Sequence, residues 1–274
     1  MSLFTIDPAK CKRDGICAAA CPSALIIAPA GDHLPQPIPE AAELCINCGH
    51  CAAACPHGAL ELAAMPLAAM PALKRELKVS AEQADQFLAG RRSIRNFKPE
   101  ALDRDTLQHL LEVTAYAPSG HNIQPVAWLV LQGRERLDAL AKLVIRWMQG
   151  LVAAGHPLAG QMHMARVIER WQAGKDVILR QAPAVAVAHA PKDERTAPAA
   201  CTIALTYLEL SAHGQGLGAC WAGFFNAAAN FFPPMQEALA LPAGHAAFGA
   251  MMLGRTAERY WRLPLRKAPD VIWR

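Results

Sequence analysis

Residues 45–56 read CINCGHCAAACP, four cysteines at the spacing C-x2-C-x2-C-x3-C followed directly by a proline. A second run, CKRDGICAAACP at residues 11–22, repeats this spacing, except that Asp14 stands at the second ligand position. Seven of the nine cysteines in the chain fall within these two runs. Cysteines at such intervals are typical of metal sites, because one short loop can direct several thiolates toward a common centre. The pattern predicts that this part of the chain binds metal.

The spacing is specific for [4Fe–4S] clusters, since C-x2-C-x2-C-x3-C-P is the run by which bacterial-type ferredoxins hold them. Three cysteines of a run bind three irons of one cube, and the fourth reaches the neighbouring cluster. One site, the four-cysteine site, is thus predicted to have four thiolate ligands, and the other, the Asp14 site, three. The ligands are Cys21, Cys45, Cys48 and Cys51 in the four-cysteine site, and Cys11, Cys17, Cys55 and Asp14 in the Asp14 site.

Asp14 leaves two interpretations open. A carboxylate is a harder ligand than a thiolate, so the Asp14 site would hold either a [4Fe–4S] cube with one labile iron or a [3Fe–4S] cluster. Asp14 is equally compatible with an ordinary turn residue that does not touch iron. Structural zinc sites also use Cys-x2-Cys pairs, but two interleaved runs that each close on Cys-Pro disfavour zinc.

The composition of the 274-residue chain is that of a globular protein, with 53% apolar and 18% charged residues. The opening MSLFTIDPAK lacks the basic and apolar regions of a secretory signal, and no apolar stretch is clean enough to span a bilayer. We therefore expect a cytoplasmic protein in a reducing compartment, with no membrane partner. The net charge of +4 is unevenly spread, since residues 1–60 carry three Lys or Arg against five Asp or Glu, which leaves +6 on the remainder. A basic remainder suits an anionic cofactor, whereas no aromatic-interleaved basic stripe supports nucleic-acid binding.

The chain is expected to divide at an internal repeat, LAAMPLAAMP at residues 62–71. We predict an iron–sulfur domain over residues 1–61, a linker over 62–79 and a second domain over 80–274. Hydrophobic periodicity makes the second domain α+β, with more helix than strand. The predicted helices run from Ser80 to Leu88, from Asp103, over 134–154 and 162–173, from Thr196 to near His213 and over 235–239, and the strands lie at 126–132, 184–190, 219–225 and 246–254.

Two segments of the second domain are suited to a phosphate-bearing cofactor. The first segment, RRSIR at residues 91–95, places three guanidinium groups and a hydroxyl within five residues. This favours phosphate, because arginine is a permanently charged, bidentate donor. Such a segment by itself is equally compatible with a solvated basic turn. The second, APSGHNIQP at residues 117–125, is rich in turn residues and lies between a predicted helix and a predicted strand. The residues of the first segment are Arg91, Arg92, Ser93 and Arg95.

Together these segments resemble the FMN-binding signature of the nitroreductase family, RRSxRxF followed by APSxxNxQP. The resemblance runs from about Arg91 to Arg266 and includes GLGACWAGFF and the tail RLPLRK. One departure is Val126, where many members have Trp. The resemblance implies an intertwined homodimer with FMN at the subunit interface. It also implies roles for residues of this chain: Arg91, Arg92, Ser93 and Arg95 for the phosphate and ribityl chain, Pro118, Ser119, Gly120, Asn122 and Gln124 along the isoalloxazine, Trp221 and Gly223 near its N5 edge, and Arg262 and Arg266 closing on the phosphate.

These features predict a ferredoxin-like domain fused to a nitroreductase-like domain in an FMN-dependent oxidoreductase. Electrons would pass from NAD(P)H or a reduced ferredoxin or flavodoxin through two clusters to FMN, and then to a small nitro- or quinone-like acceptor. The alternative is an electron-transfer or redox-sensing relay that turns over no small molecule. A specialised flavin enzyme of the same fold is a third reading. No side chain stands out as a general acid or base, so no catalytic residue is predicted.

Three further patterns are not expected to bind ligands. Residues 214–219 satisfy G-x-G-x-x-A, but they follow a predicted helix and precede a predicted strand, the reverse of a dinucleotide site. Cys201 and Cys220 are expected to be buried, inert thiols. Most of the ten histidines, including His50 and His57 beside the cysteine runs, are expected to be surface or packing residues.

Overall fold

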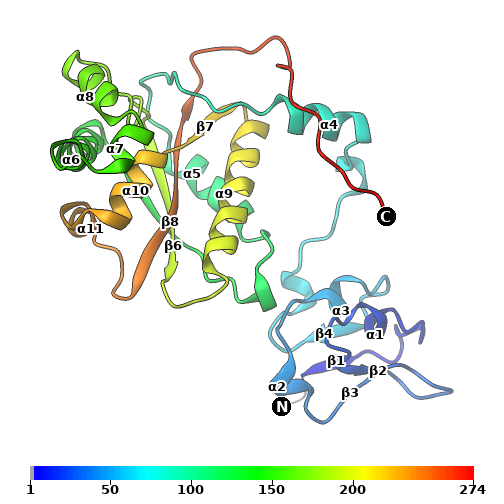
Figure 1. Ribbon diagram of the computed structural model, residues 1–274. Helices are drawn as coiled ribbons and strands as arrows, with labels where there is room; N and C mark the ends of the chain where they lie inside the picture. The colour runs from blue at the N-terminus through cyan, green and yellow to red at the C-terminus, as the bar shows by residue number, and fades with distance from the viewer. Residues whose placement is uncertain (1–2) are drawn as a thin grey trace. The chain divides into compact units, whose positions relative to one another are not determined.

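The computed structural model describes residues 3–274, which contacts divide into two units (Figure 1). The first unit comprises the chain up to Lys78 together with His121–Ile123, and the second comprises Val79–Gly120 and Gln124–Arg274. The predicted iron–sulfur domain lies in the first unit, apart from Met1 and Ser2, which are outside the described residues.

The first unit is built from short elements around a small apolar core. Its two small antiparallel sheets pair β1 with β4 and β2 with β3. Phe4, Leu60 and Leu62 are buried between them. The elements are β1 (Phe4–Ile6), α1 (Ile16–Ala20), β2 (Ile26–Ile27), β3 (Gln36–Pro37), α2 (Ala41–Leu44), α3 (His50–Ala53) and β4 (Leu60–Leu62).

The repeat predicted to be a linker is partly packed. It contains the 3₁₀ turn η1 (Leu67–Ala69), and a second turn, η2 (Arg75–Leu77), follows it. Met65, Leu67 and Met70 lie against the core of the first unit. These apolar side chains of the repeat therefore pack against the first unit. Leu73 and Leu77, which follow the repeat, are exposed.

The second unit is organised by a four-stranded antiparallel sheet with the strand order β5-β6-β8-β7. Alternate side chains point to opposite faces, so Ala184 and Ala186 enter one core while Val185 and Val187 enter the other. Both faces of the sheet are therefore apolar and need a cover. The strands are β5 (Ala127–Gln132), β6 (Ala184–Pro191), β7 (Leu217–Trp221) and β8 (His245–Arg255).

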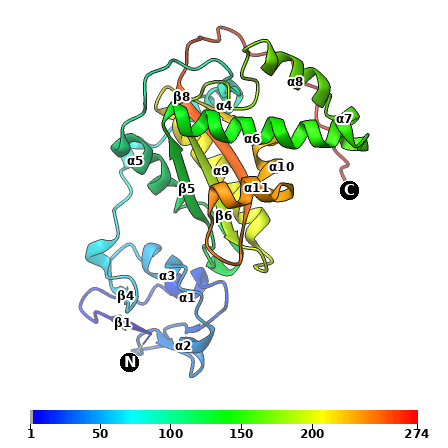
Figure 2. The ribbon, with the colours of Figure 1, turned by 90° about the vertical axis from the view of Figure 1, so that its left-hand side faces the viewer.

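Helices cover both faces of this sheet. Figure 1 shows α9 on one side of β6 and β8, with α6, α10 and α11 on the other, and Figure 2 shows α6 crossing the sheet. No helix among the described residues is long and apolar enough to cross a membrane. The helices are α4 (Ala81–Gly90), α5 (Arg104–Thr114), α6 (Arg134–Ala153), α7 (Pro157–Gln161), α8 (Met164–Gln172), α9 (Ala197–Gly214), α10 (Gly223–Phe231) and α11 (Pro233–Leu239), and a 3₁₀ turn, η3, spans Gly120–Asn122.

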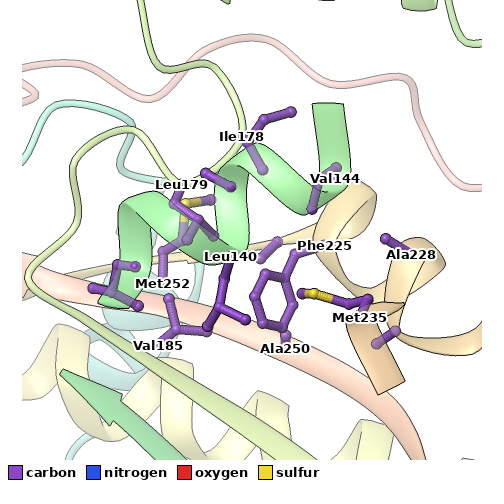
Figure 3. Close-up of a cluster of buried hydrophobic side chains, with 14 of the residues drawn as sticks. Leu140, Val144, Ile178, Leu179, Val185, Phe225, Ala228, Met235, Ala250 and Met252 are labelled. Atoms are coloured by element: carbon purple, nitrogen blue, oxygen red, sulfur yellow. The ribbon is translucent and has the colours of Figure 1, made fainter. Parts of the chain in front are cut away.

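Large apolar side chains fill the layer between α6 and the sheet. Phe225 of α10 and Met235 of α11 meet Leu140 of α6 over Val185 and Ala250 of the strands (Figure 3). Phe225 and Met235 have no exposed surface. Burial of this kind contributes roughly 1.5–3 kcal/mol per large side chain, so this layer is a main source of stability for the second unit.

On the opposite face, a glycine allows α9 to lie close to the sheet. A Cβ atom added at Gly249 would stand 2.3 Å from Cδ1 of Leu205. A side chain at this position would have to displace Leu205, so the glycine lets α9 pack directly against β8.

Most predicted elements of the second unit are confirmed. The capping box at Ser80 is present, with Gln83 N donating to Ser80 Oγ at 3.1 Å and Ser80 N donating to Gln83 Oε1 at 2.8 Å. The strand predicted over 219–225 is wrong beyond Trp221, because α10 begins at Gly223. Periodicity cannot distinguish a strand from a buried helix in a short run of apolar letters.

The structure also places the three patterns that were not expected to bind ligands. Residues 214–219 join the end of α9 to β7, the order expected from the sequence and unsuited to a dinucleotide. Cys201 and Cys220 are both buried, and burial raises the pKa of Cys201 to about 12, so this thiol stays protonated. His189 is buried in β6, where its Nδ1 lies 2.9 Å from Nδ1 of His245.

Candidate functional site

The four cysteines predicted for the four-cysteine site line one cavity of the first unit. Burial raises the pKa of Cys51, and the nearby Cys21 and Cys45 thiols raise it further. Iron binding to this site must therefore release protons, because thiolates rather than thiols are the ligands. The lining includes Cys21, Cys45, Cys48, Cys51 and Ser23.

The residues predicted for the Asp14 site line a second cavity of the same unit, together with His57. Asp14 Oδ1 accepts a hydrogen bond from the backbone N of Ile16 at 3.1 Å, and its Oδ2 lies 3.8 Å from His57 Nε2. The structure thus groups the seven cysteines as the crossover of the two runs predicts. The ligand-type residues of this cavity are Cys11, Asp14, Cys17, Cys55 and His57.

The donors around these cavities fit iron–sulfur clusters. Backbone N–H groups of Leu25 and Ala59 donate to the sulfurs of Cys21 and Cys55, each at 3.3 Å, and such bonds help to set a cluster's potential. Within residues 3–274 no three His, Cys, Asp or Glu side chains approach one another closely enough for a single metal ion. Ligands of a cube stand farther apart than ligands of one ion, because each binds a different iron.

The segment that contains the predicted phosphate ligands runs beside β7 in the second unit. Ser93 forms a parallel bridge with Ala219, and Ile94 N donates to Ala219 O at 2.9 Å. This approach requires Gly218, since an added Cβ would lie 2.7 Å from Cγ2 of Ile94. The backbone of the segment is therefore held by the sheet, which leaves the arginine side chains available for other contacts.

Arg91 and Arg92 line a cavity of about 560 Å³, which we name the arginine cavity. Arg91 Nη1 lies 2.8 Å from Oε1 of Glu209, whose side chain is only 8% exposed. A buried carboxylate is stable when paired, so this contact fixes Arg91 at the wall of the cavity. The other charged residues of the lining are Lys98, Glu258 and Arg259, and His213 also lines it.

Glu209, Lys98 and Arg259 line the arginine cavity but were not predicted from the sequence as site residues. A signal for Glu209 was present, because it is the only Asp, Glu, Lys or Arg in α9, whose other residues are mostly apolar. A lone charge in an apolar helix requires a buried partner. Lys98 and Arg259 carry no comparable signal, since their position depends on how the chain returns past β8.

The predicted flavin loop at residues 117–125 lines a different cavity, of about 220 Å³, which we name the loop cavity. Ser119 Oγ accepts a hydrogen bond from Gln124 N at 2.9 Å, which closes the loop. An added Cβ at Gly120 would stand 2.7 Å from Cγ2 of Thr196, so a larger residue there would have to displace the Thr196 side chain. The lining includes Pro118, Ser119 and Gln124 from the loop, Val126 just before β5, and Ala200 and Ala204 from α9.

The remaining predicted residues line neither cavity. Asn122 belongs to the first unit, where Nδ2 donates to the carbonyl oxygens of Ile46 and Asn47 at 3.0 Å each. Arg95 Nη1 donates to Ser93 O at 3.4 Å. Trp221 ends β7 with 39% of its surface exposed, and Gly223 begins α10. Arg262 and Arg266 lie in an exposed C-terminal segment without helix or strand.

Each unit matches a known protein family. The family model described as Nitroreductase family matches residues 88–255, and the family model described as 4Fe-4S dicluster domain matches residues 9–60. The chain belongs to the nitroreductase family. The resemblance inferred from the RRSxRxF and APSxxNxQP segments is therefore confirmed, as is the α+β class with a ferredoxin-type N-terminal domain.

Curated relatives match over short stretches. The chain is 38% identical over 84 residues to a 4-nitrobenzoate reductase of Nocardioides sp. (strain LMS-CY), which is 31% of this chain and 30% of that protein. It is 34% identical over 65 residues to the nitroreductase NfnB of Mycolicibacterium smegmatis, which is 24% of this chain and 27% of that protein. The chain thus spans less than a third of the length of these relatives.

Solved structures show the same fold for the second unit. A nitroreductase with bound FMN from Bacteroides fragilis has a TM-score of 0.58 and 21% identity, covering 69% of this chain and 97% of its own. A BluB-like flavoprotein from Clostridium difficile 630 has a TM-score of 0.54 and 19% identity, covering 68% and 94%. These likenesses establish the architecture of the sheet and its helices.

Proposed function

We propose that this chain is an FMN-dependent oxidoreductase that carries two iron–sulfur clusters. One observation supports it above the others: the thiols of the first unit gather into two cavities, while the family's arginine segment lines a cavity of about 560 Å³ in the second unit. Iron–sulfur clusters move one electron at a time, and FMN supplies both one- and two-electron chemistry. Their fusion suits conversion between the two.

The arginine cavity is the proposed site of the FMN phosphate. Arg91 and Arg92 would donate charge-assisted hydrogen bonds to the dianion, and Lys98 and Arg259 add positive charge to the same lining. Glu209 would hold the Arg91 guanidinium in a fixed orientation, so that less rotamer entropy is lost when the ligand binds. Ser93 and Arg95, on the segment beside β7, are proposed to contact the phosphate and the ribityl chain.

A second copy of the chain is proposed to complete each FMN site. Glu209 lines the arginine cavity and Ala204 lines the loop cavity, and five residues of helix rotate them roughly 140° apart around α9. The two sets of predicted flavin residues therefore lie on different faces of one helix. A symmetric dimer would bring the arginine cavity of one copy beside the loop cavity of the other. Trp221 and Gly223 are proposed to lie near N5, and Arg262 and Arg266 to close on the phosphate.

In the proposed reaction, a reduced ferredoxin or flavodoxin would supply single electrons to clusters held by the first unit and through them to FMN, whereas a nicotinamide would transfer its hydride directly to FMN. FMN held by the second unit would then supply the electrons that reduce a small nitro- or quinone-like acceptor. A cytoplasmic, reducing compartment would keep the seven cysteines available to iron. No described side chain is assigned as a general acid or base.

The test begins with the composition of the protein purified without oxygen. We expect iron and acid-labile sulfide for two clusters and one FMN per chain, and zinc in place of iron would contradict the proposal. Anaerobic titration with NADH, NADPH and reduced ferredoxin then identifies the donor. Addition of a nitroaromatic or quinone to the reduced protein should reoxidise the flavin with release of reduced acceptor.

The alternative is a relay in which both kinds of cofactor only pass electrons. The cluster domain favours it, because its two sites suit exchange with another redox protein. A relay would reoxidise with a protein partner and not with any small acceptor. Turnover of a nitroaromatic or quinone at a rate that saturates with its concentration would exclude it.

A further inference from the structure

The two cysteine runs are related by an internal repeat in structure as well as in sequence. Cys11 corresponds to Cys45 and Cys21 to Cys55, an offset of 34 residues. Gly15 and Gly49 both have φ of 75° and precede α1 and α3. The same N–H to sulfur bond of 3.3 Å follows each Cys-Pro pair. Residues at this offset therefore occupy equivalent places around the two cavities.

Two differences between the halves of the repeat fall on the same cavity. Asp14 corresponds to Cys48, and His57 corresponds to Ser23. Cys48 and Ser23 both line the four-cysteine cavity, whereas Asp14 and His57 both line the Asp14 cavity. The cavity that lacks a ligand thiol is thus the cavity that presents an imidazole.

We propose that His57 binds iron at the Asp14 site, through Nε2, at the corner that has no thiolate. This inference rests on the proposed presence of two clusters. His57 Nε2 lies 3.8 Å from Asp14 Oδ2, so both side chains face one region of the cavity. Asp14 Oδ1 already accepts the turn hydrogen bond from Ile16 N. Imidazole is a softer ligand than carboxylate and replaces cysteine in Rieske centres.

The binding step is a ligand exchange without electron transfer. The Nε2 lone pair of the neutral imidazole, with its proton on Nδ1, binds the iron, and a water molecule or the Asp14 carboxylate leaves it. Asp14 then closes the turn beside the iron. A neutral nitrogen in place of a thiolate leaves this cluster one negative charge short of the four-cysteine cluster, so its reduction potential should be the higher of the two.

The test uses the full-length holoprotein labelled with ¹⁵N-histidine. Pulsed electron paramagnetic resonance should detect a ¹⁵N coupling on one cluster, and His57→Ser, which installs the residue of the other half, should remove it. His50→Ser is the matched control, because His50 is exposed and lines neither cluster cavity. After brief exposure to air, His57→Ser should show several-fold more [3Fe–4S] signal than the control.

Asp14→Asn separates the two candidate ligands, because the amide keeps the turn acceptor and loses the carboxylate. It should retain the ¹⁵N coupling. Two intact clusters without a histidine coupling, or a coupling that survives in His57→Ser, would overturn the ligand assignment and leave the proposed function standing. Loss of the odd iron in Asp14→Asn but not in His57→Ser would also overturn it. A protein without iron would overturn both proposals.

Discussion

Arg91 and Glu209 meet at 2.8 Å although 118 residues separate them in the chain. Glu209 is a buried residue of the apolar helix α9, and Arg91 is the residue that caps the C-terminus of α4. Removing one partner of such a pair leaves the other charge without compensation, which costs about 3–5 kcal/mol when the pair is fully buried and less here, because Arg91 is partly exposed. The pair therefore couples stability to the proposed phosphate site.

We predict that Arg91→Ala and Arg95→Ala lose FMN and keep their clusters. Each lost charge-assisted hydrogen bond to the phosphate should cost roughly 1.5–3 kcal/mol, a decrease in affinity of about 10- to 150-fold. Flavin and iron content after gel filtration are the measurements. Arg136→Ala is the control, since Arg136 is exposed on α6 and lines neither cavity. Wild-type FMN retention in both variants would contradict the phosphate assignment.

Asp14 is the second position where one residue should change the chemistry. In Asp14→Cys the run becomes C-x2-C-x2-C-x3-C-P, so the Asp14 site should hold a stable cube with a lower reduction potential. Air-exposed wild type should show a [3Fe–4S] signal that the variant lacks, and the four-cysteine cluster should stay intact in both. Equal cluster stability and equal potentials in the two proteins would make Asp14 an ordinary turn residue.

At the scale of elements, the arginine segment depends on β7 for its position. Its bridge to Ala219 brings a chain segment from before α5 beside a strand that follows α9, and Gly218 provides the space. The GLGACW motif thus serves the approach of the RRSIRNF segment. The small residue is required because Ile94 lies where a side chain at position 218 would be.

Gly218→Ala should therefore destabilise the second unit by about 1–3 kcal/mol and weaken FMN binding. The new methyl group would overlap Ile94 and push the arginine segment away from β7. Chemical unfolding and FMN affinity are the measurements, in a double-mutant cycle with Ile94→Ala. The double variant should be less destabilised than the sum of the single variants, and strict additivity would show that the two positions do not meet.

At the scale of the whole molecule, the predicted flavin residues do not share one cavity. The arginine segment lines the arginine cavity and the 117–125 loop lines the loop cavity. Large apolar side chains of the C-terminal segment are also exposed, among them Trp261, Leu265 and Trp273 at 78%, 97% and 89%. Exposed apolar surface of this kind marks an interaction site, which agrees with the proposed homodimer.

Complementation between two defective chains tests this arrangement. Arg91→Ala removes the phosphate contact, and Ser119→Leu fills the loop cavity with apolar bulk, so each homodimer should lack FMN. A mixed dimer would contain one site built from the intact Arg91 of one copy and the intact Ser119 of the other. Differently tagged chains, co-expressed and purified as mixed dimers, should bind about half of the wild-type FMN. Mixed dimers without FMN would place each site within a single chain.

Local sequence determined the ligand spacing within each cysteine run, the capping box at Ser80 and the main strands and helices of the second unit. These features depend on residues close together in the chain, where ligand spacing, hydrogen bonding and hydrophobic period act directly. The boundary at Gly223 was not predictable, because an apolar run suits a strand or a buried helix until its neighbours are known.

Only the tertiary structure decided which distant side chains meet. Glu209 reaches Arg91 because α9 packs against the sheet that also holds the arginine segment. His57 faces Asp14 because the crossover of the two runs folds the end of one beside the start of the other. Contacts between residues so far apart in the chain depend on how elements pack around a shared core. A local sequence pattern does not specify that packing.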